Sequence, residues 1–319
     1  MSDTSPPGDA REAAADPATR IFLDHRELLF SIVYNMLATV ADTEDVLQET
    51  WLSWAGRNEA ADAGGIASPR AYLVRIAVNK ALARKDALAR RRETYVGPWL
   101  PEPLVTGLTG VADTPAATGT GDVADAAERS EALSMALLVV LETLTPLERA
   151  VFVLHEVFGY AHTETSVILG RSPAAVRQLA HRAREHVHAR RPRYQADPLL
   201  HRQVTERFTD AVFGGDLGAL LRLLAPDVIL LGDGGGKAAA AGPRPVTGRD
   251  KVARLLVARA AHRPEGLSVH YRQINGDPSV LLFADGSPFA VLVLDLTPDG
   301  EHVCGIYNVT NPDKLSRLG

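Results

Sequence analysis

Apolar side chains recur with helical spacing along the first part of the chain. Over residues 20–38 they lie three or four positions apart, which places them on one face of a helix. A second helix is expected to begin near Asp42 or Thr43, because either side chain can cap its first turn. Glycines and Pro69 mark a loop before a third helix. The pattern therefore predicts a helical unit over residues 20–95.

Helical spacing resumes after a change in composition. Residues 97–127 are rich in Gly, Pro, Thr and Ala, which is typical of a linker. Beyond Leu133 the leucines again fall on one helical face. Gly170 is suited to end one helix, and Ser172 to cap the next. Two helices joined by so short a turn have the spacing of a helix-turn-helix.

The apolar pattern changes again at about residue 196. Two helical stretches come first, at 198–214 and 249–261. Four strands are expected after them, at 267–275, 279–285, 288–296 and 301–309. Helices followed by consecutive strands predict an α+β domain with a curved antiparallel sheet wrapped around a helix.

Charge is sharply partitioned within the first helical unit. Residues 24–62 hold eight acidic and two basic residues, whereas residues 70–92 hold eight basic residues and one acidic residue. The acidic stretch suits a basic protein partner, and the basic stretch suits DNA phosphates. Solvated helix faces are the alternative explanation. Residues 171–193 repeat the basic pattern, with seven arginines against Glu185 alone.

Composition limits the remaining possibilities. The 319 residues are 46% hydrophobic with a net charge of −5, which allows two or three globular domains. Cys304 is the only cysteine, so intramolecular disulfides and multi-cysteine metal sites are excluded. Residues 1–19 lack the features of a signal peptide and are expected to form a disordered acidic tail. The aliphatic runs are too short to span a bilayer. Together with the single cysteine and the lack of a signal peptide, this favours a cytoplasmic protein. No metal or cofactor is expected.

Three segments resemble the extracytoplasmic-function (group 4) sigma factors of RNA polymerase. TEDVLQETWLSW, beginning at Thr43, is similar to the segment of sigma domain 2 that binds the polymerase clamp. RAYLVRIAVNKALARKDALARRR, beginning at Arg70, is similar to the helix that melts the promoter and reads its −10 element. The helix-turn-helix region from Leu144 to Glu185 resembles sigma domain 4, which reads the −35 element.

Three pentapeptides resemble the sigma subgroup that carries a C-terminal SnoaL-like domain. They are WLPEP at 99–103, DGGGK at 233–237 and NPDKL at 311–315. The resemblance implies two all-α sigma domains, the second with a helix-turn-helix, and an α+β SnoaL-like cone domain with a curved antiparallel sheet. The implied division is a tail (1–19), sigma domain 2 (20–95), a linker with WLPEP (96–129), sigma domain 4 (130–194) and a regulatory SnoaL-like domain (195–319).

The resemblance also implies four groups of functional residues. The polymerase-binding group is Asp45, Gln48, Glu49 and Trp51. The group that binds the −10 element is Arg75, Asn79, Lys80 and Arg84. The group that binds the −35 element is Arg171, Arg177, Gln178, His181, Arg182 and Arg184. The interdomain regulatory group is Trp99, Leu100, Pro101, Glu102, Pro103, Asp233, Gly234, Gly235, Gly236, Lys237, Asn311, Pro312, Asp313, Lys314 and Leu315. Within it, Lys237 is expected to pair with Asp233 or to contact a sigma domain.

A sigma factor without enzymatic activity is the expected function. The implied partners are promoter DNA and core RNA polymerase, through the clamp region of its largest subunit and its flap region. The C-terminal domain is expected to modulate this activity in cis, so that no separate anti-sigma factor is required. One alternative is a SnoaL-type cyclase, isomerase or ligand sensor with a DNA-binding leader, whose cavity residues would be Asp295, His270, Tyr271 and Tyr307. A second alternative is a stand-alone repressor.

Overall fold

The computed structural model describes residues 17–60, 66–92, 94–106, 133–190, 197–238 and 241–318. Most of the expected N-terminal tail and the greater part of the expected linker lie outside these residues. Within the described part of the chain, no helix is long and apolar enough to cross a membrane.

The first helical unit is a bundle of three helices. They are α1 (Pro17–Leu37), α2 (Val40–Ala60) and α3 (Pro69–Arg92). Fully buried side chains such as Ile32 and Leu73 fill the space between them. The helix expected to begin near Asp42 or Thr43 begins at Val40, so that prediction is wrong by two to three residues. A corner at Ala38, where φ is +60°, turns the chain sharply from α1 into α2.

The second helical unit contains the helix-turn-helix. Its elements are α5 (Met135–Leu141), α6 (Pro146–Phe152), the π-helix η1 (Val153–Val157), α7 (His162–Leu169) and α8 (Pro173–Arg190). Thr145 and Glu148 form a capping box at the start of α6. Gly170 ends α7 in the left-handed conformation, with φ of +61°, as its position in the sequence predicts.

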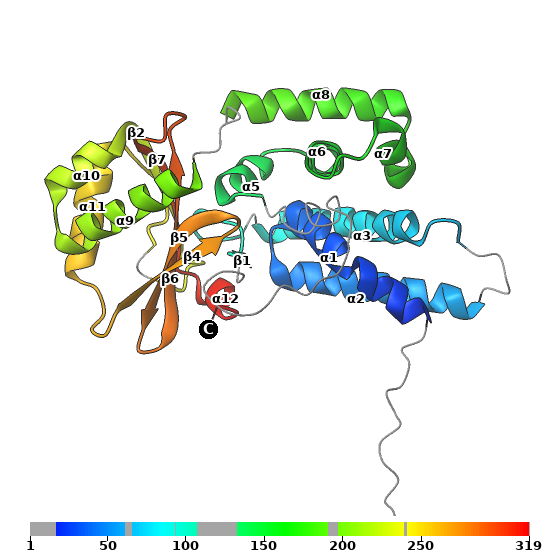
Figure 1. The fold of residues 1–319 in the computed structure, drawn as a ribbon, viewed down its shortest axis with the longest axis horizontal. Coiled ribbons are helices and arrows are strands. Elements are labelled where there is room, and N and C mark those ends of the chain that lie inside the picture. The colour runs from blue at the N-terminus through cyan, green and yellow to red at the C-terminus, as the bar shows by residue number, and fades with distance from the viewer. Residues whose placement is uncertain are drawn as a thin grey trace, which may run out of the picture.

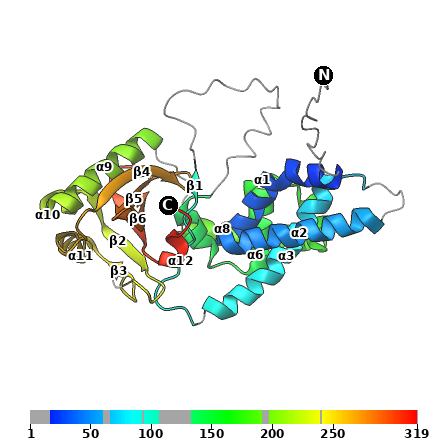
Figure 2. The same ribbon diagram turned by 90° about the horizontal axis from the view of Figure 1, so that it is seen from below.

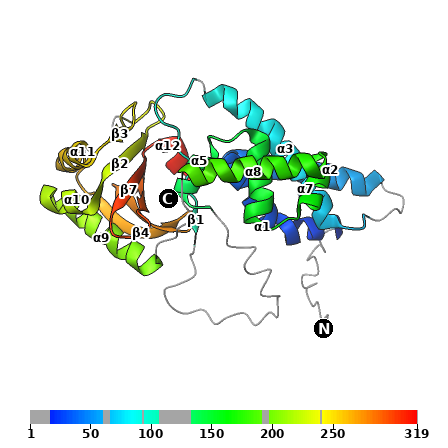
Figure 3. The same ribbon diagram turned by 90° about the horizontal axis from the view of Figure 1, so that it is seen from above.

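The two helical units share one hydrophobic core. Ile32 and Leu73 of the first unit belong to the same buried cluster as Val151 and Ile168 of the second. Helices α6 and α7 lie between α8 and α3 (Figure 1). Viewed from above, α8 lies across the other helices of both units (Figure 3). The two units are therefore closed against each other.

The C-terminal domain packs three helices against a seven-stranded sheet. The helices are α9 (Pro198–Gly214), α10 (Leu217–Leu223) and α11 (Arg249–Ala261). The sheet order is β1-β4-β5-β6-β7-β2-β3. The strands are β1 (Val105–Thr106), β2 (Leu224–Asp233), β3 (Val246–Thr247), β4 (Ser268–Ile274), β5 (Asp277–Ala284), β6 (Ser287–Leu296) and β7 (Val303–Val309). A short helix, α12 (Pro312–Leu315), follows β7.

This domain has the expected α+β architecture with one correction. The four predicted strands correspond to β4–β7, and these pair with antiparallel neighbours. Strand β2, which the sequence pattern did not predict, pairs with β7 in parallel, so the whole sheet is mixed and the expected antiparallel pairing holds for β4–β7. The helix α11 separates β2 from the later strands, so β2 does not form a hairpin with β7.

Both faces of the sheet are covered. On one face, Leu294 and Ile306 pack against α9, α10 and α11. On the other, Val293 packs in a cluster with Leu100 and with Met135 of α5. The linker also adds β1 to the sheet edge at β4. Figures 1 and 2 show α12 between the sheet and the first helical unit, so the segments that join the domains lie on this second face.

Candidate nucleic-acid interface and interdomain site

The predicted polymerase-binding acids lie on α2, opposite basic residues of α3. Asp45 and Glu49 are one turn apart and are about half exposed. Arg84 forms ion pairs with Asp42, at 2.8 Å, and with Asp45, while Lys80 Nζ lies 3.5 Å from Glu49 Oε2. The hydrogen bond to Asp42 raises the pKa of Arg84. Two of the four predicted −10 contacts are thus held by acids of their own helical unit.

The other polymerase-binding candidates differ in position. Gln48 is exposed on α2. Trp51 is partly buried against Phe22, with 5.5 Å between the ring centroids. Trp54 is buried and donates a hydrogen bond to the carbonyl oxygen of Ala18. Trp51 therefore contributes to the edge of the core and does not share the exposed surface of Gln48.

Of the remaining −10 candidates, Asn79 contacts the second helical unit and Arg75 does not. Arg75 is exposed, and its carbonyl oxygen accepts a hydrogen bond from Asn79 Nδ2. The same Asn79 amide donates to the carbonyl oxygen of Ile168 in α7, at 3.1 Å. Asn79, one of the four predicted −10 contacts, is therefore hydrogen-bonded to the helix-turn-helix unit. Lys80 and Arg84 are thus paired with acids of α2 and Asn79 is bonded to α7, while Arg75 is exposed.

The −35 candidates lie mainly on one exposed side of the helix-turn-helix. The exposed members are Arg171, Arg177, Gln178, His181 and Arg182. Arg184 is the exception, because it is half-buried and its Nε lies 3.4 Å from Glu156 Oε1. On the opposite side of α8, Val176, Ala180 and Ala183 are fully buried in the core. The helix thus presents a basic surface while its apolar side holds it in place.

All three signature pentapeptides meet at Asp233, which is completely buried. Its Oδ2 accepts hydrogen bonds from Leu100 N at 2.8 Å and from Lys314 Nζ at 2.7 Å. Its Oδ1 accepts from Gly235 N at 3.1 Å and from the Tyr95 hydroxyl. The hydrogen bond to Asp233 and burial both raise the pKa of Tyr95, burial having the larger effect. We call Asp233, Lys314, Tyr95 and Leu100 the interdomain staple.

Lys314 occupies the centre of the interdomain staple. Its ammonium lies 4.1 Å from the centroid of the Trp99 ring and donates to the carbonyl oxygen of Leu100. Lys237 pairs with Asp313 at 2.8 Å on the surface, so the expected pairing of Lys237 with Asp233 is wrong. The correct pairing is Asp233 with Lys314 inside and Lys237 with Asp313 outside.

The glycines of DGGGK permit this close packing. Gly235 has φ of +58°, and a Cβ atom there would collide with the side-chain amide of Asn311. Gly236 has φ of +72°, and its added Cβ would approach Val96 to 3.1 Å. The turn is therefore fitted against both the NPDKL segment and the linker.

Glu102 of the linker connects the first helical unit to the C-terminal sheet. Its Oε2 accepts from Val40 N at 2.7 Å, which caps α2, and its backbone N–H donates to Ala38 O at 2.9 Å. The Tyr34 hydroxyl donates to Glu102 O and accepts from Asn275 Nδ2, both at 2.7 Å. Burial raises the pKa of Glu102 and of Tyr34. Tyr34 and Asn275, which sequence reasoning missed, complete this connection.

A second group missed by sequence reasoning lies between the helical units. Glu142, at the end of α5, pairs with Lys85 of α3 at 2.9 Å and with Arg149 of α6. Arg149 Nε also donates to Asn35 O at 2.8 Å. The sequence signal was weak, because Lys85 belongs to a long basic run and the acid that holds it is 57 residues away.

The four residues expected in a cyclase cavity do not all lie on one face of the sheet. Tyr271 packs on the α9 side of the sheet. Tyr307 lies in the cluster on the opposite face, and strand alternation places Asp295 and His270 on that face too. A cavity between α9 and α10 is lined by residues including Arg207, Asp216 and Arg222, and none of the four belongs to its lining.

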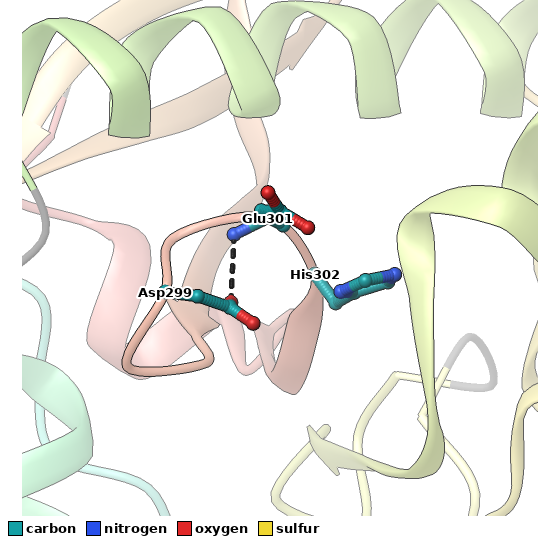
Figure 4. Close-up of side chains that lie close together, drawn as sticks. All are labelled: Asp299, Glu301 and His302. Atoms are coloured by element: carbon teal, nitrogen blue, oxygen red, sulfur yellow. Dashed lines mark hydrogen bonds between the residues drawn. The ribbon is translucent and has the colours of Figure 1, made fainter.

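One group in the described part of the chain is spaced for a metal ion. Asp299, Glu301 and His302, in the turn between β6 and β7, have ligand atoms within 4.8 Å of one another (Figure 4). Asp299 Oδ1 already accepts from Thr297 Oγ1 and from Glu301 N, and the bond from Thr297 lowers the pKa of Asp299. The cluster is largely exposed, so its bonds mainly shape the turn.

Known proteins match both helical units and the chain as a whole. The family Sigma-70 region 2 matches residues 21–93, and Sigma-70, region 4 matches residues 134–187. The ECF RNA polymerase sigma factor SigJ of Mycobacterium tuberculosis is 36% identical over 301 residues, covering 91% of each chain. The probable ECF RNA polymerase sigma factor SigI of the same species is 29% identical over 303 residues, covering 95% of this chain and 96% of SigI. The crystal structure of M. tuberculosis SigJ matches with a TM-score of 0.69 and 34% identity, covering 93% of this chain and 98% of that one.

Proposed function

The chain belongs to the extracytoplasmic-function sigma factors of RNA polymerase, and from this membership we propose that its C-terminal domain controls promoter recognition in cis. As a sigma factor it is a transcription initiation factor and not an enzyme, and it binds core polymerase and promoter DNA. The first helical unit is sigma region 2, and the second is sigma region 4. The proposal concerns how the two are held.

The closed packing of the two units is incompatible with reading both promoter elements. The −35 and −10 elements are separate stretches of B-form DNA, which rises about 3.4 Å per base pair, so the units that read them must stand apart. Asn79 of the first unit, however, is hydrogen-bonded at 3.1 Å to Ile168 of the second. We therefore propose that the second unit must leave α3 before the promoter is bound.

The C-terminal domain is placed to oppose this separation. It contacts the first unit through the Asn275–Tyr34 hydrogen bond and through Glu102 of the linker. It contacts the second unit through Met135, which packs on the same face of the sheet. A tethered domain acts at an effective concentration of about millimolar, so even a weak interface can hold the closed form. On this ground we propose that no separate anti-sigma factor is required.

The surfaces proposed for polymerase and the −35 element stay accessible in the closed form. Asp45, Gln48 and Glu49 are exposed on α2, and we propose them as polymerase contacts. The basic surface of α8 that includes Arg177 and Arg182 is also exposed, and we propose that it enters the major groove. We propose that closure acts on the −10 surface chiefly through Asn79, which is bonded to the second unit.

The interdomain staple carries the proposal, and run-off transcription tests it. Core polymerase would be supplied with the full chain or with Lys314→Met, over promoter-bearing genomic fragments. We expect more transcript from Lys314→Met, because the broken staple favours the open form. Lys237→Met is the matched control, because it removes a lysine that lies in another of the three pentapeptides but at the surface. It should give as much transcript as wild type. Equal or lower output from Lys314→Met, with the fold of both sigma units intact, would overturn the proposal.

A further inference from the structure

A buried ion triad lies at the boundary between the two helical units. Glu142 Oε2 and Oε1 lie 2.9 and 3.1 Å from Lys85 Nζ, and Arg149 donates to Oε1. The side chains of Lys85, Glu142 and Arg149 are only 9%, 16% and 1% exposed. Two cations therefore share one carboxylate in a setting that solvent barely reaches.

Lys85 differs from its basic neighbours on α3 in the origin of its carboxylate. Lys80 and Arg84 pair with Glu49, Asp42 and Asp45, which all belong to α2 of the same unit. Those pairs survive any movement of the second unit. The carboxylate beside Lys85 comes from α5, and it leaves when the units separate.

The surface around Lys85 is also the one that closure covers. Asn79, six residues earlier on α3, is bonded to α7 in the same interface. Helix α3 contacts both α6 and α7. Separation therefore breaks the hydrogen bond between Asn79 and Ile168 and takes the Glu142 carboxylate away from Lys85, on a helix of strongly basic sequence.

We propose that Glu142 occupies the place of a promoter phosphate, and that Lys85 is a further DNA-backbone contact, masked until the units separate. The inference rests on the opening described under the proposed function. Burying a cation without an opposite charge is unfavourable, so Lys85 needs an anion wherever α3 packs against a partner. In the closed form the anion is Glu142, and on the promoter it is a phosphate. Glu142 and DNA then compete for the same ammonium.

Lysine labelling of the unmodified protein tests this directly. The chain has five lysines, at positions 80, 85, 237, 251 and 314, so each can be followed by mass spectrometry after brief treatment with an amine-reactive reagent. Exposed Lys237 and Lys251 serve as internal references. Labelling would be compared for the free chain, for the holoenzyme, and for the holoenzyme on promoter DNA.

Each result has a defined meaning. We expect Lys85 to react slowly in the free chain, readily in the holoenzyme, and slowly again when promoter DNA is added. Continued reactivity of Lys85 on promoter DNA would overturn the inference and leave the proposed opening intact. A slow Lys85 and a slow Lys314 in a transcribing holoenzyme would instead contradict the opening itself, so the two failures are distinguishable.

A pair of variants in the full chain gives an independent measurement. Glu142→Gln should raise the affinity of the free chain for promoter DNA severalfold, and Glu265→Gln, which makes the same change of charge at an exposed site, should not. Adding Lys85→Met to Glu142→Gln should reduce the slope of log K against log salt by about 0.7–0.9, the value for one phosphate contact. An unchanged slope would exclude Lys85 from the DNA interface.

Discussion

Replacement of Lys314 by methionine probes the ion pair at the centre of the interdomain staple. Lys314 Nζ lies 2.7 Å from Asp233 Oδ2, and the side chains are 9% and 0% exposed. Methionine keeps most of the aliphatic stem, so the main loss is the charge. Removing one partner of a buried pair leaves the other uncompensated, at a cost of about 3–5 kcal/mol. We expect the free energy of unfolding of the C-terminal domain to fall by about this amount.

Urea unfolding followed by tryptophan fluorescence can measure this loss. Trp99 lies against Lys314 and reports on the staple, whereas Trp51 and Trp54 lie in α2 and report on the first helical unit. The signals must be analysed separately, because a multidomain chain need not unfold in one step. Lys237→Met should change the unfolding free energy by less than about 0.5 kcal/mol, since its ion pair with Asp313 is exposed.

The double variant Asp233→Asn with Lys314→Met completes the argument. If uncompensated charge causes the loss, the double variant should be more stable than the sum of the two single losses predicts. Strictly additive losses would mean that the two side chains do not interact. A wild-type unfolding midpoint for Lys314→Met would refute the reasoning altogether.

Three further changes test other parts of the structure. Gly235→Ala should lower the thermal midpoint of the C-terminal domain, because φ is +58° there and the added Cβ collides with Asn311; an unchanged midpoint would contradict this. Burial raises the pKa of Glu102 in the folded protein above its ordinary value of 4.5, so the folded state binds this proton more tightly than the unfolded state. That contribution to the stability of wild type is lost as the pH rises from 4.5 through the raised pKa. Glu102→Gln does not titrate and should gain stability relative to wild type from pH 4.5 toward neutrality, and parallel melting curves at all pH values would argue against it. Asp45→Arg should abolish co-purification with core polymerase while circular dichroism stays unchanged, and retained binding would remove Asp45 from the proposed contact.

Features set by neighbouring residues were predictable from the sequence. The helical spacing of apolar residues, the capping box at Thr145 and the left-handed Gly170 all depend on positions within a few residues of one another. The start of α2 was not predictable in this way. Its first N–H groups are capped by Glu102, which lies 62 residues beyond Val40 and reaches it only in the folded chain.

The direction of β2 and the pairing within the staple depend on register across the sheet. Alternation of apolar residues identifies a strand but does not say which neighbour it takes or in which direction. Parallel pairing sets Asp233 opposite Val309, so the end of β2 meets the NPDKL segment two residues later. The tight DGGGK turn then carries Lys237 outward to Asp313. The sequence pointed to the three pentapeptides as interdomain segments, whereas their meeting at Asp233 and their individual partners depend on the register.

The chemistry of the interdomain contacts suits a closure that must be reversible. Ion pairs such as Asp233–Lys314 and Glu142–Lys85 fix geometry but add little net stability, because desolvation offsets much of their attraction. On opening, their charges regain water or phosphate. The apolar part of the boundary behaves differently, since separating α7 from α3 exposes side chains such as Ile168, at about 25 cal/mol per Å². Opening in water alone is therefore unfavourable, and a partner that covers these surfaces must drive it. We propose that core polymerase is this partner, so that promoter binding depends on assembly of the holoenzyme.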